Sequence, residues 1–478
     1  MKKAVIILIF IMATSTVFGQ SIEDGLRVSN SNGMVTPRVA GLNVAYNGLV
    51  DDIGALVYNP AGLAWIGNNE LSFGFGFNHI QTDVDFLDYS NDFSVNNAYL
   101  SHFGLSVPFK AGKRPAAIGF GYFQESDYEN YMKFSGFNAN NSLIGWTAAN
   151  GSRDYDDNLA TYLALANADF YTPLRDSLTQ FGTVTEEGGM RNLNGSASFE
   201  VSDYVSVGVG LSGKFGSYKY YMEYDEVDGA DGVNRYDSYE PDYSNIDFTK
   251  LMVNDRIDQE ISGITGSIGV LAKYEDFFRV SMAIQFPTWY QINETSYREG
   301  YVDYDNGDTE TNPYEKNYES SYNVTTPFVY RGGISFHAAG ITFSTGIEYT
   351  DVTQMSFSDG SFGAGDVEAL NRQIMEELTG QVTWGFGVEY DIPLVPIVGR
   401  ASYSKTTSPY GNDIANANRS NFSIGGGVYF GDNIRVDGVF RWQEIAELRQ
   451  IYGNMDNGAY YIYERKPFSV GMMITYRY

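Results

Sequence analysis

Phe468-Ser-Val-Gly-Met-Met-Ile-Thr-Tyr-Arg-Tyr478 ends the chain and alternates large apolar residues with residues that are mostly small or polar. The residues of its apolar set are Phe468, Val470, Met472, Ile474, Tyr476 and Tyr478. In a β-strand, such alternation puts one set of side chains on each face. About ten residues with aromatic side chains at the end match a strand that crosses an outer membrane. A soluble β-sandwich could end on the same pattern, so this stretch alone leaves both folds open.

The beginning of the chain favours export. Lys2 and Lys3 precede a largely apolar run that ends near the small residue Gly19, the pattern of a secretory signal peptide. We expect residues 1–19 to be removed near Gln20 and the mature protein to reside in the outer membrane of a Gram-negative-type bacterium. The run is shorter than the ~20 residues of a transmembrane helix, and no later stretch is apolar for that length. A form of this chain that spans a membrane must therefore do so with strands.

Composition excludes several other functions. The formal charge of -28 provides no basic surface for a phosphate backbone, so we expect no nucleic-acid partner. The absence of cysteine rules out a disulfide framework, a thiol nucleophile and a lipoprotein anchor. The three histidines are far apart on predicted strands, without the spacing of a catalytic triad or a metal site. We therefore expect no enzymatic activity, no cofactor and no metal.

Alternating runs bounded by turn residues predict about fourteen strands between Asn69 and the C-terminus. Three of the clearest apolar faces are Tyr99, Phe103, Leu105, Val107 and Phe109; Val205, Val207, Val209, Leu211 and Phe215; and Val382, Trp384, Phe386, Val388 and Tyr390. The opposite faces carry mainly Gly, Ser, Thr and charged residues. An apolar outside and a small or polar inside is the pattern of a membrane barrel, the reverse of a soluble core.

The predicted connections alternate in length, as in an outer-membrane barrel with short periplasmic turns and long extracellular loops. The six short links are 110–115, 202–203, 274–276, 337–340, 391–395 and 431–433. The seven long links are 80–97, 126–189, 225–255, 293–320, 355–379, 406–418 and 446–458. The sequence thus predicts an all-β fold: a fourteen-stranded antiparallel transmembrane β-barrel over residues 69–478 with both ends on the periplasmic side.

Two long links are predicted to be partly helical. In 156–181 the apolar residues Leu163, Phe170, Leu174 and Leu178 fall largely on one helical face, with a second helix starting near Pro173. Another helix is predicted within 355–379. The apolar face of 156–181 has two interpretations. It packs on neighbouring loops, which is the favoured interpretation for any single residue, or it is the site that first captures a hydrophobic ligand. Acidic residues of the long links, such as Glu226 and Asp228, are interpreted as solvated loop residues rather than calcium ligands.

Residues 20–68 are too many for a tail and lack the alternation of a barrel strand. They are rich in glycine and other small residues, and the Asn59-Pro60 step favours an extended residue followed by a turn or helix start. A barrel of about fourteen strands has a wide interior that must be filled to prevent leakage. We therefore predict that this segment, called the hatch below, is a plug inside the lumen.

Asp51-Asp-Ile-Gly-Ala-Leu-Val-Tyr-Asn-Pro-Ala-Gly-Leu-Ala64 resembles the hatch segment of the FadL/TodX family of outer-membrane transporters for hydrophobic compounds. The matching hatch residues, to which the resemblance assigns gating, are Asn59, Pro60 and Ala61. Segments 326–336, 347–355 and 399–409 resemble later strands of that family. The resemblance implies a monomeric barrel in membrane lipid that takes up long-chain fatty acids or other hydrophobic molecules. The ligand would be captured among extracellular loops, bind inside the barrel and leave sideways through an opening at a kinked strand.

Carried onto this chain, the kink would fall in the third strand, 116–124, at Gly119 and Gly121. These glycines are equally well explained as small residues that face the hatch. A ligand carboxylate would need a cation in the lumen, and the candidates by strand position are Arg400, Arg435, Arg441 and Arg477. Most of these are expected instead to pair with lumen acids such as Asp437 or Glu389.

Two alternatives to a transporter remain. A barrel of related architecture could serve as a protein secretion or surface-attachment component, because the Asn-Pro-Ala triplet does not distinguish it from a transporter. Such a component would be distinguished by loops that bind proteins and by the lack of an apolar tunnel for a small molecule. A plain diffusion porin is less favoured because of the hatch.

Overall fold

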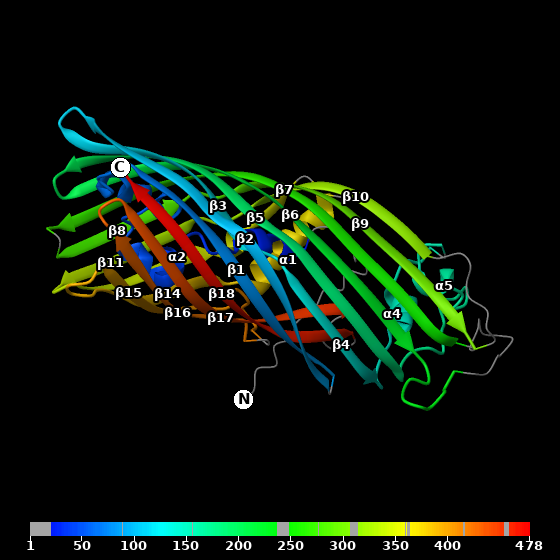
Figure 1. Ribbon diagram of the computed structural model, residues 1–478. Coiled ribbons are helices and arrows are strands. Elements are labelled where there is room, and N and C mark those ends of the chain that lie inside the picture. Colours follow the sequence, from blue (N-terminus) through cyan, green and yellow to red (C-terminus); the bar gives the residue numbers. More distant parts are fainter. Residues whose placement is uncertain are drawn as a thin grey trace, which may run out of the picture.

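The computed structural model describes residues 21–478 except 88, 155, 237–247, 276, 306–313, 359, 361–363, 414–415 and 454–457. The predicted signal peptide, 1–19, lies outside the described residues. One antiparallel sheet of eighteen strand segments is rolled into a barrel (Figure 1). None of the described helices is both long enough and apolar enough to cross a membrane.

The strand segments are β1 (Glu70–Phe86), β2 (Tyr89–Ala111), β3 (Arg114–Asp127), β4 (Asn130–Asn138), β5 (Leu178–Ser202), β6 (Val205–Val227), β7 (Phe248–Tyr274), β8 (Phe278–Gln285), β9 (Trp289–Tyr304), β10 (Tyr314–Thr325), β11 (Val329–Ala338), β12 (Ile341–Asp351), β13 (Ser356–Ser358), β14 (Gly380–Asp391), β15 (Ile397–Thr406), β16 (Arg419–Phe430), β17 (Ile434–Tyr452) and β18 (Ala459–Arg477). The helices are α1 (Ile22–Ser29), α2 (Pro37–Leu42), α3 (Ala55–Tyr58), α4 (Leu143–Asn150), α5 (Leu159–Tyr162) and α6 (Ala364–Glu377). The 3-10 helices are η1 (Asn43–Gly48), η2 (Pro60–Trp65) and η3 (Val352–Gln354).

The described segments make fourteen barrel strands, because four strands consist of two segments each: β3 with β4, β8 with β9, β10 with β11 and β12 with β13. The breaks in the strands β8–β9 and β10–β11 lie side by side and contain Pro287 and Pro327. Proline has no N–H to donate to a ladder, which explains why both strands are interrupted there. The predicted fourteen-stranded fold is confirmed.

Pairing of β18 with β1 closes the barrel, for example at Ile474 opposite Phe73. In the C-terminal stretch, Val470, Met472, Ile474, Tyr476 and Tyr478 are exposed, and Phe468 is half-buried. The residues between them that point inward and are buried are Ser469, Gly471, Met473 and Thr475. The predicted outward apolar face of this strand is therefore confirmed.

One predicted face is wrong in part, because Tyr99 points into the lumen whereas Phe103 is exposed on the outside. The pairing of β1 with β2 skips Ser101, so that Phe75 pairs with Leu100 and the preceding glycine pairs with His102. Such a β-bulge adds one residue and inverts the faces on either side of it. An alternation read from sequence cannot detect this inversion.

The six short turns are confirmed at one end of the barrel, but several predicted long loops are strands. The predicted loop 80–97 is wrong: β1 and β2 continue to a tight connection around Leu87, which has a positive φ. Most of 293–320 likewise belongs to β9 and β10. Beyond the membrane both faces of a strand can be polar, so the alternation fades although the hydrogen-bonded ladder persists.

The helix predicted within 355–379 is confirmed as α6, whereas the helical face predicted within 156–181 is wrong. Only the single turn α5 forms there, and Leu178 begins β5. Ala164, Phe170 and Ser177 have positive φ, which no right-handed helix permits. The main helix of this loop, α4, lies upstream and was not predicted.

The hatch, described from Ser21 to Asn68, lies inside the barrel, with α1, α2, η1, α3 and η2 against the inner wall (Figure 1). Helix α1 begins at a capping box in which Ser21 and Asp24 exchange hydrogen bonds. The wall is glycine-rich where the hatch approaches: a Cβ on Gly346 would lie 1.9 Å from the Val44 carbonyl oxygen. Glycine there allows the two backbones to touch.

Two further apolar clusters lie inside the barrel, and the first of them includes residues of the hatch. One packs α1 under η3, β13 and α6, with Ile374 buried. The other joins α4, α5 and the outer parts of the wall strands. The interpretation of Glu226 and Asp228 as solvated loop residues is wrong, because both are buried. Glu226 accepts a hydrogen bond from the Leu143 N–H at the start of α4 at 2.6 Å. A carboxylate at a helix N-terminus satisfies free N–H groups and is favoured by the helix dipole.

Candidate ligand-binding site

A cavity lies in the lumen beside α1 of the hatch, between this helix and strands β5, β6, β16, β17 and β18. Its empty volume, which includes open solvent, is about 870 Å³. The charged side chains of its wall are Glu23, Glu186, Glu447, Arg27, Arg419, Arg449 and Arg465. The cavity is therefore suited to a ligand with a polar head.

Three of these arginines are already neutralised by carboxylates. The pairs are Arg27–Asp24 at 2.6 Å, Arg449–Glu186 at 2.9 Å and Arg465–Glu447 at 3.0 Å. Arg419 has no ion pair within 4.0 Å among the described residues. A guanidinium group enclosed by protein is stabilised by an anion, because it has lost part of its hydration. Arg419 is thus the cation of this cavity most available to an anionic ligand.

Glu23 of α1 also faces the cavity. Partial desolvation by the surrounding protein raises the pKa of its carboxyl group.

The hatch is hydrogen-bonded to the third barrel strand beside this cavity. The Gly33 N–H donates to the Glu125 carbonyl at 2.8 Å. The Asn32 side chain both accepts from the Asp127 N–H at 3.0 Å and donates to the Asp127 carbonyl at 3.3 Å. Asn32 and Tyr128 both line the cavity. A ligand in the cavity therefore touches the hatch and the third strand at the point where they join.

The third strand leaves the barrel ladder at this point. Pairing between β2 and β3 ends at His102 opposite Phe123, and the register with β5 shifts between Gln124 and Ser126. Beyond the shift, β4 pairs with β5, but no ladder joins it to β2 among the described residues. The wall consequently has a seam between the outer half of β2 and β4, called the β2–β4 seam below.

Side chains bridge the β2–β4 seam in place of a backbone ladder. The buried carboxylate of Asp127 accepts hydrogen bonds from Asn78 of β1 and, at 3.1 Å, from Asn97 of β2. It also accepts from the Glu129 N–H at 3.2 Å. Side-chain bonds of this kind can be broken without dismantling the ladders of the neighbouring strands.

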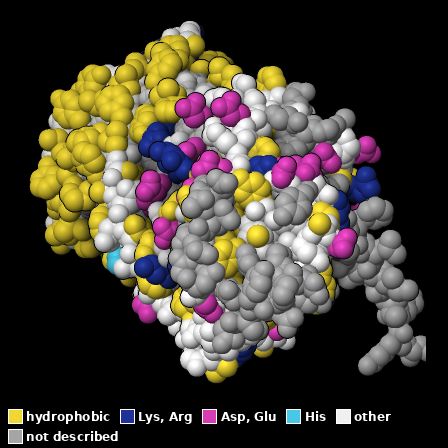
Figure 2. Space-filling view, turned by 90° about the vertical axis from the view of Figure 1, so that its right-hand side faces the viewer, with side chains coloured by type: hydrophobic (Ala, Val, Ile, Leu, Met, Phe, Trp, Pro, Cys, Tyr) yellow, Lys and Arg dark blue, Asp and Glu magenta, His cyan; other side chains and the backbone are white. Residues whose placement is uncertain are grey.

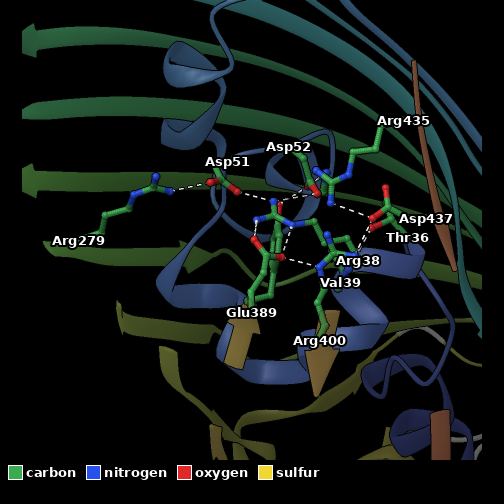
Figure 3. Close-up of polar contacts among 12 residues, drawn as sticks. Thr36, Arg38, Val39, Asp51, Asp52, Arg279, Glu389, Arg400, Arg435 and Asp437 are labelled. Atoms are coloured by element: carbon green, nitrogen blue, oxygen red, sulfur yellow. Dashed lines mark hydrogen bonds and ion pairs between the residues drawn. The ribbon is translucent and has the colours of Figure 1, made fainter. Parts of the chain in front are cut away.

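An alternating row of charges holds the hatch against the wall (Figure 3). Its ion pairs, in spatial order, are Arg279–Asp51, Asp51–Arg38, Arg38–Glu389, Glu389–Arg400, Arg400–Asp437 and Asp437–Arg435. Arg38 also pairs with Asp52 at 3.2 Å, and Asp52 accepts from the Tyr46 hydroxyl at 2.6 Å. Four guanidinium groups thus face four carboxylates across the lumen.

This arrangement places Arg38 at the centre of the attachment. Burial alone would raise the pKa of the Asp51 carboxyl, but the Arg38 and Arg279 guanidiniums hold it well below its usual range. Arg38 meets Glu389 through two parallel hydrogen bonds of 3.2 Å each, the bidentate geometry of a strong pair. Removing Arg38 would leave three acids without their shared cation.

A second hollow lies at the other end of the molecule, on the loop that carries α4. Its empty volume is about 650 Å³, and Trp146, Phe170 and Arg175 line it. Figure 2 shows this end, where acidic and basic side chains are interspersed and hydrophobic side chains cover one flank. The hollow presents aromatic side chains at the extracellular surface.

The Asn-Pro-Ala triplet lies where the hatch meets the wall near the six short turns. Asn59 caps η2 by accepting from the Ala61 N–H at 3.0 Å, and donates to the Val270 and Met282 carbonyls. Pro60 occupies the first position of η2, which needs no N–H. The triplet thus both starts a helix and attaches the hatch to β7 and β8.

The structure separates the four residues proposed for ligand capture. Leu163, Leu174 and Leu178 are completely buried in the outer apolar cluster, as the packing interpretation expected. Only Phe170 borders the extracellular hollow.

Gly119 and Gly121 lie in continuous register with both neighbouring strands, and a Cβ on either would lie within about 3 Å of Leu56 of the hatch. The register between β3 and β5 shifts downstream of these glycines, at Glu125. The irregularity of the third strand therefore lies at Glu125 and not at the proposed position, Gly119 and Gly121. The second interpretation, small residues facing the hatch, agrees with these contacts.

The four lumen arginines are engaged, as expected for most of them. Arg400 and Arg435 pair with Asp437, and Arg477 pairs with Glu70 at 3.1 Å. Arg441 instead donates to the backbone carbonyls of the hatch at Asn32 and Gly33. None of the four lines the cavity.

Sequence reasoning missed Arg419, Asp127 and Arg38. Arg419 begins a strand after a long link, a position that gives no sign of its neighbours. The run Gln124-Glu-Ser-Asp127 did contain a signal, since it interrupts the apolar alternation of the third strand with consecutive polar residues.

The geometry defines a plugged β-barrel of the outer-membrane type, with an apolar outer face, a lumen cavity and a seam in its wall. Scans against protein-family models and against curated proteins find no match. Among solved structures, a FadL homologue from Pseudomonas aeruginosa matches with a TM-score of 0.57 and 13% identity, over 92% of this chain and 98% of that one. The toluene transporter TbuX of Ralstonia pickettii matches with a TM-score of 0.52 and 15% identity, over 94% and 99%.

The toluene transporter TodX of P. putida matches with a TM-score of 0.52 and 11% identity, over 89% of this chain and 94% of that one. The chain therefore has the FadL/TodX fold along nearly its whole described length. These are transporter structures, and the fold is that of an outer-membrane barrel.

Proposed function

We propose that this protein takes up hydrophobic compounds with an anionic head, such as long-chain fatty acids, across the outer membrane. The observation that carries the proposal is the position of the cavity: it touches both the hatch and the third strand where the β2–β4 seam begins. The structural neighbours that are described as toluene transporters support a hydrophobic small-molecule cargo. No observation favours the alternative of a protein secretion or surface-attachment component.

In this proposal the ligand first meets the extracellular hollow at Trp146 and Phe170, then enters the cavity with its head at Arg419. The acyl chain gains about 0.8 kcal/mol per CH₂ removed from water, so release sideways into lipid is favoured over release into the periplasm. The β2–β4 seam provides the side exit, and Asn59, Pro60 and Ala61 hold the hatch that blocks the direct route. The protein acts as a monomer, because one chain contains the hollow, the cavity and the seam.

Binding of labelled oleate and of labelled oleyl alcohol to delipidated protein tests this assignment. The two ligands share a tail, and only oleate carries a charge. Arg419→Gln should weaken oleate binding about 10-fold or more, since a hydrogen bond to a charged group contributes about 1.5–3 kcal/mol, and should leave oleyl alcohol binding nearly unchanged.

The matched control is Arg256→Gln, which removes an exposed arginine of the outer wall that is paired with Asp258. It should change neither affinity. If neither ligand binds saturably and a secreted protein copurifies instead, the transporter assignment is wrong and the secretion alternative replaces it. If oleate binds but Arg419→Gln has no effect, the head group lies elsewhere.

A further inference from the structure

The longest turn at the end opposite the α4 loop is apolar. The link between β14 and β15, residues 392–396, reads Ile-Pro-Leu-Val-Pro and is followed by Ile397 of β15. It contains no polar side chain, whereas the turns at Lys113, Asp203 and Asp432 are polar and the turn Ala339-Gly340 has only small residues. Ile392, Leu394, Val395 and Ile397 are all exposed, and Leu394 is completely so. A run of exposed apolar side chains is unfavourable in water and marks a contact surface.

The turn continues the lipid-facing surface of the two strands it joins. The outward residues of β14 include Phe386 and Tyr390, and the same parity leads to Ile392. On the other side, Ile397 begins the outward set of β15. The apolar surface of the wall therefore extends without interruption past Tyr390 and around the turn.

The backbone of the turn is suited to a medium without water. The N–H groups of Ile392, Val395 and Ile397 donate to backbone carbonyls of the turn itself. Pro393 and Pro396 have no N–H to satisfy. Buried backbone donors without partners are costly in lipid, and this turn presents few of them.

The tip of the turn has a left-handed backbone conformation. Leu394 has a φ of 71°, a left-handed conformation that costs little for glycine and more for leucine. Positive φ values in other turns of this end are found at Gly112, Gly340 and Gly431, and also at Glu275 and Ala339.

We infer that the Ile392–Ile397 turn inserts into the periplasmic leaflet of the outer membrane, with Leu394 at acyl-chain depth. The occupant of this surface is phospholipid, because the turn is continuous with the face that already contacts lipid. It anchors the barrel at its periplasmic rim beside β14 and β15. The inference does not depend on what the barrel transports.

The cysteine-free chain allows a direct depth measurement. A nitroxide is attached to Leu394→Cys, to Val395→Cys and, as control, to Asn433→Cys in the polar turn between β16 and β17. Each variant is reconstituted in vesicles of phosphatidylethanolamine and phosphatidylglycerol. Spin relaxation by oxygen, which concentrates in lipid, is compared with relaxation by a water-soluble nickel chelate.

Labels at Leu394 and Val395 should be relaxed mainly by oxygen and the label at Asn433 mainly by nickel. Nickel accessibility at both turn positions equal to that at Asn433 would overturn the inference. Protection from both reagents, seen only when a periplasmic extract is added, would assign the turn to a protein partner instead. Asn433 also reports that the vesicles are permeable to the chelate on the relevant side.

Discussion

At the scale of single residues, the lumen arginines that form ion pairs have a structural role, whereas the arginine of the cavity without such a pair among the described residues is the candidate contact for a ligand. Arg38 of the hatch pairs with Glu389 of the wall and so helps to hold the hatch in place, while Arg400 and Arg435 pair with acids of the wall itself. Arg419 lies in the same barrel but lacks such a partner among the described residues, and it faces a cavity. The same residue type thus serves as a structural cation in one place and as a candidate ligand cation in another.

Arg38→Ala should loosen the hatch without unfolding the barrel. Removing one partner of a buried ion pair costs about 3–5 kcal/mol, and here Asp51, Asp52 and Glu389 lose their common cation. Planar-bilayer recordings should show increased ion conductance, while the heat-modifiable electrophoretic mobility of the barrel stays as in the wild type.

The control is Arg114→Ala, which removes an exposed pair with Asp203 that contributes about 0–1 kcal/mol. Conductance of Arg38→Ala equal to that of Arg114→Ala would show that the charge row does not hold the hatch. Arg38→Lys keeps the charge but not the bidentate contact, and should give an intermediate result.

At the scale of elements, the third strand is the part of the wall that differs most from a regular barrel. Its lower segment, β3, is hydrogen-bonded on both sides, and its upper segment, β4, only to β5 among the described strands. The hatch supplies bonds at the transition, through Asn32 and Gly33. A movement of α1 on ligand binding would therefore act directly on the strand that borders the seam.

Cross-linking the β2–β4 seam should block transport but not binding. The double variant Asn97→Cys, Asp127→Cys replaces two side chains that touch, in a chain without other cysteines. A short cleavable thiol cross-linker should reduce oleate uptake into cells at least 10-fold, leave oleate binding to purified protein intact, and lose its effect on reduction.

The matched control joins Thr183→Cys to Glu223→Cys, a directly opposed pair on the continuous ladder between β5 and β6. Cross-linking there should leave uptake unchanged. Full uptake by the cross-linked Asn97–Asp127 variant would exclude release through this seam.

At the scale of the whole molecule, barrel and hatch are held by different forces. The wall is a closed cylinder of backbone hydrogen bonds with an apolar outside, which is stable in lipid by itself. The hatch is held inside the lumen by its helices, by buried apolar residues and by the charge row. The wall should therefore fold without its plug.

Deletion of residues 21–68 should give a folded but open pore. The expected results are an unchanged β-rich circular dichroism spectrum, heat-modifiable mobility, and conductance well above that of Arg38→Ala. Oleate binding should fall, because α1 forms one side of the cavity. Loss of the folded barrel on deletion would show instead that the hatch is part of the folding core.

Sequence alone determined the features that depend on neighbours along the chain. Period-two alternation gave the strand number and the outward face from Val470 to Tyr478, because successive side chains of a strand point to opposite sides. The parity of short turns and the unpatterned segment before Glu70 gave the closed barrel with its plug. The Asn59-Pro60-Ala61 triplet pointed to the fold that the structure has.

Tertiary structure decided what depends on contacts between distant segments. Whether a residue is buried or paired depends on through-space neighbours, so the lack of an ion pair at Arg419 among the described residues and the burial of Glu226 had no signature in the sequence. The polar run from Gln124 to Asp127 marked an irregular third strand, but only the pairing of the strands showed the β2–β4 seam. The strands also continue beyond the lipid because backbone hydrogen bonds hold them, although the side-chain alternation has ended. The C-terminal alternation predicted a membrane wall, and only the three-dimensional pairing showed where that wall is not continuous.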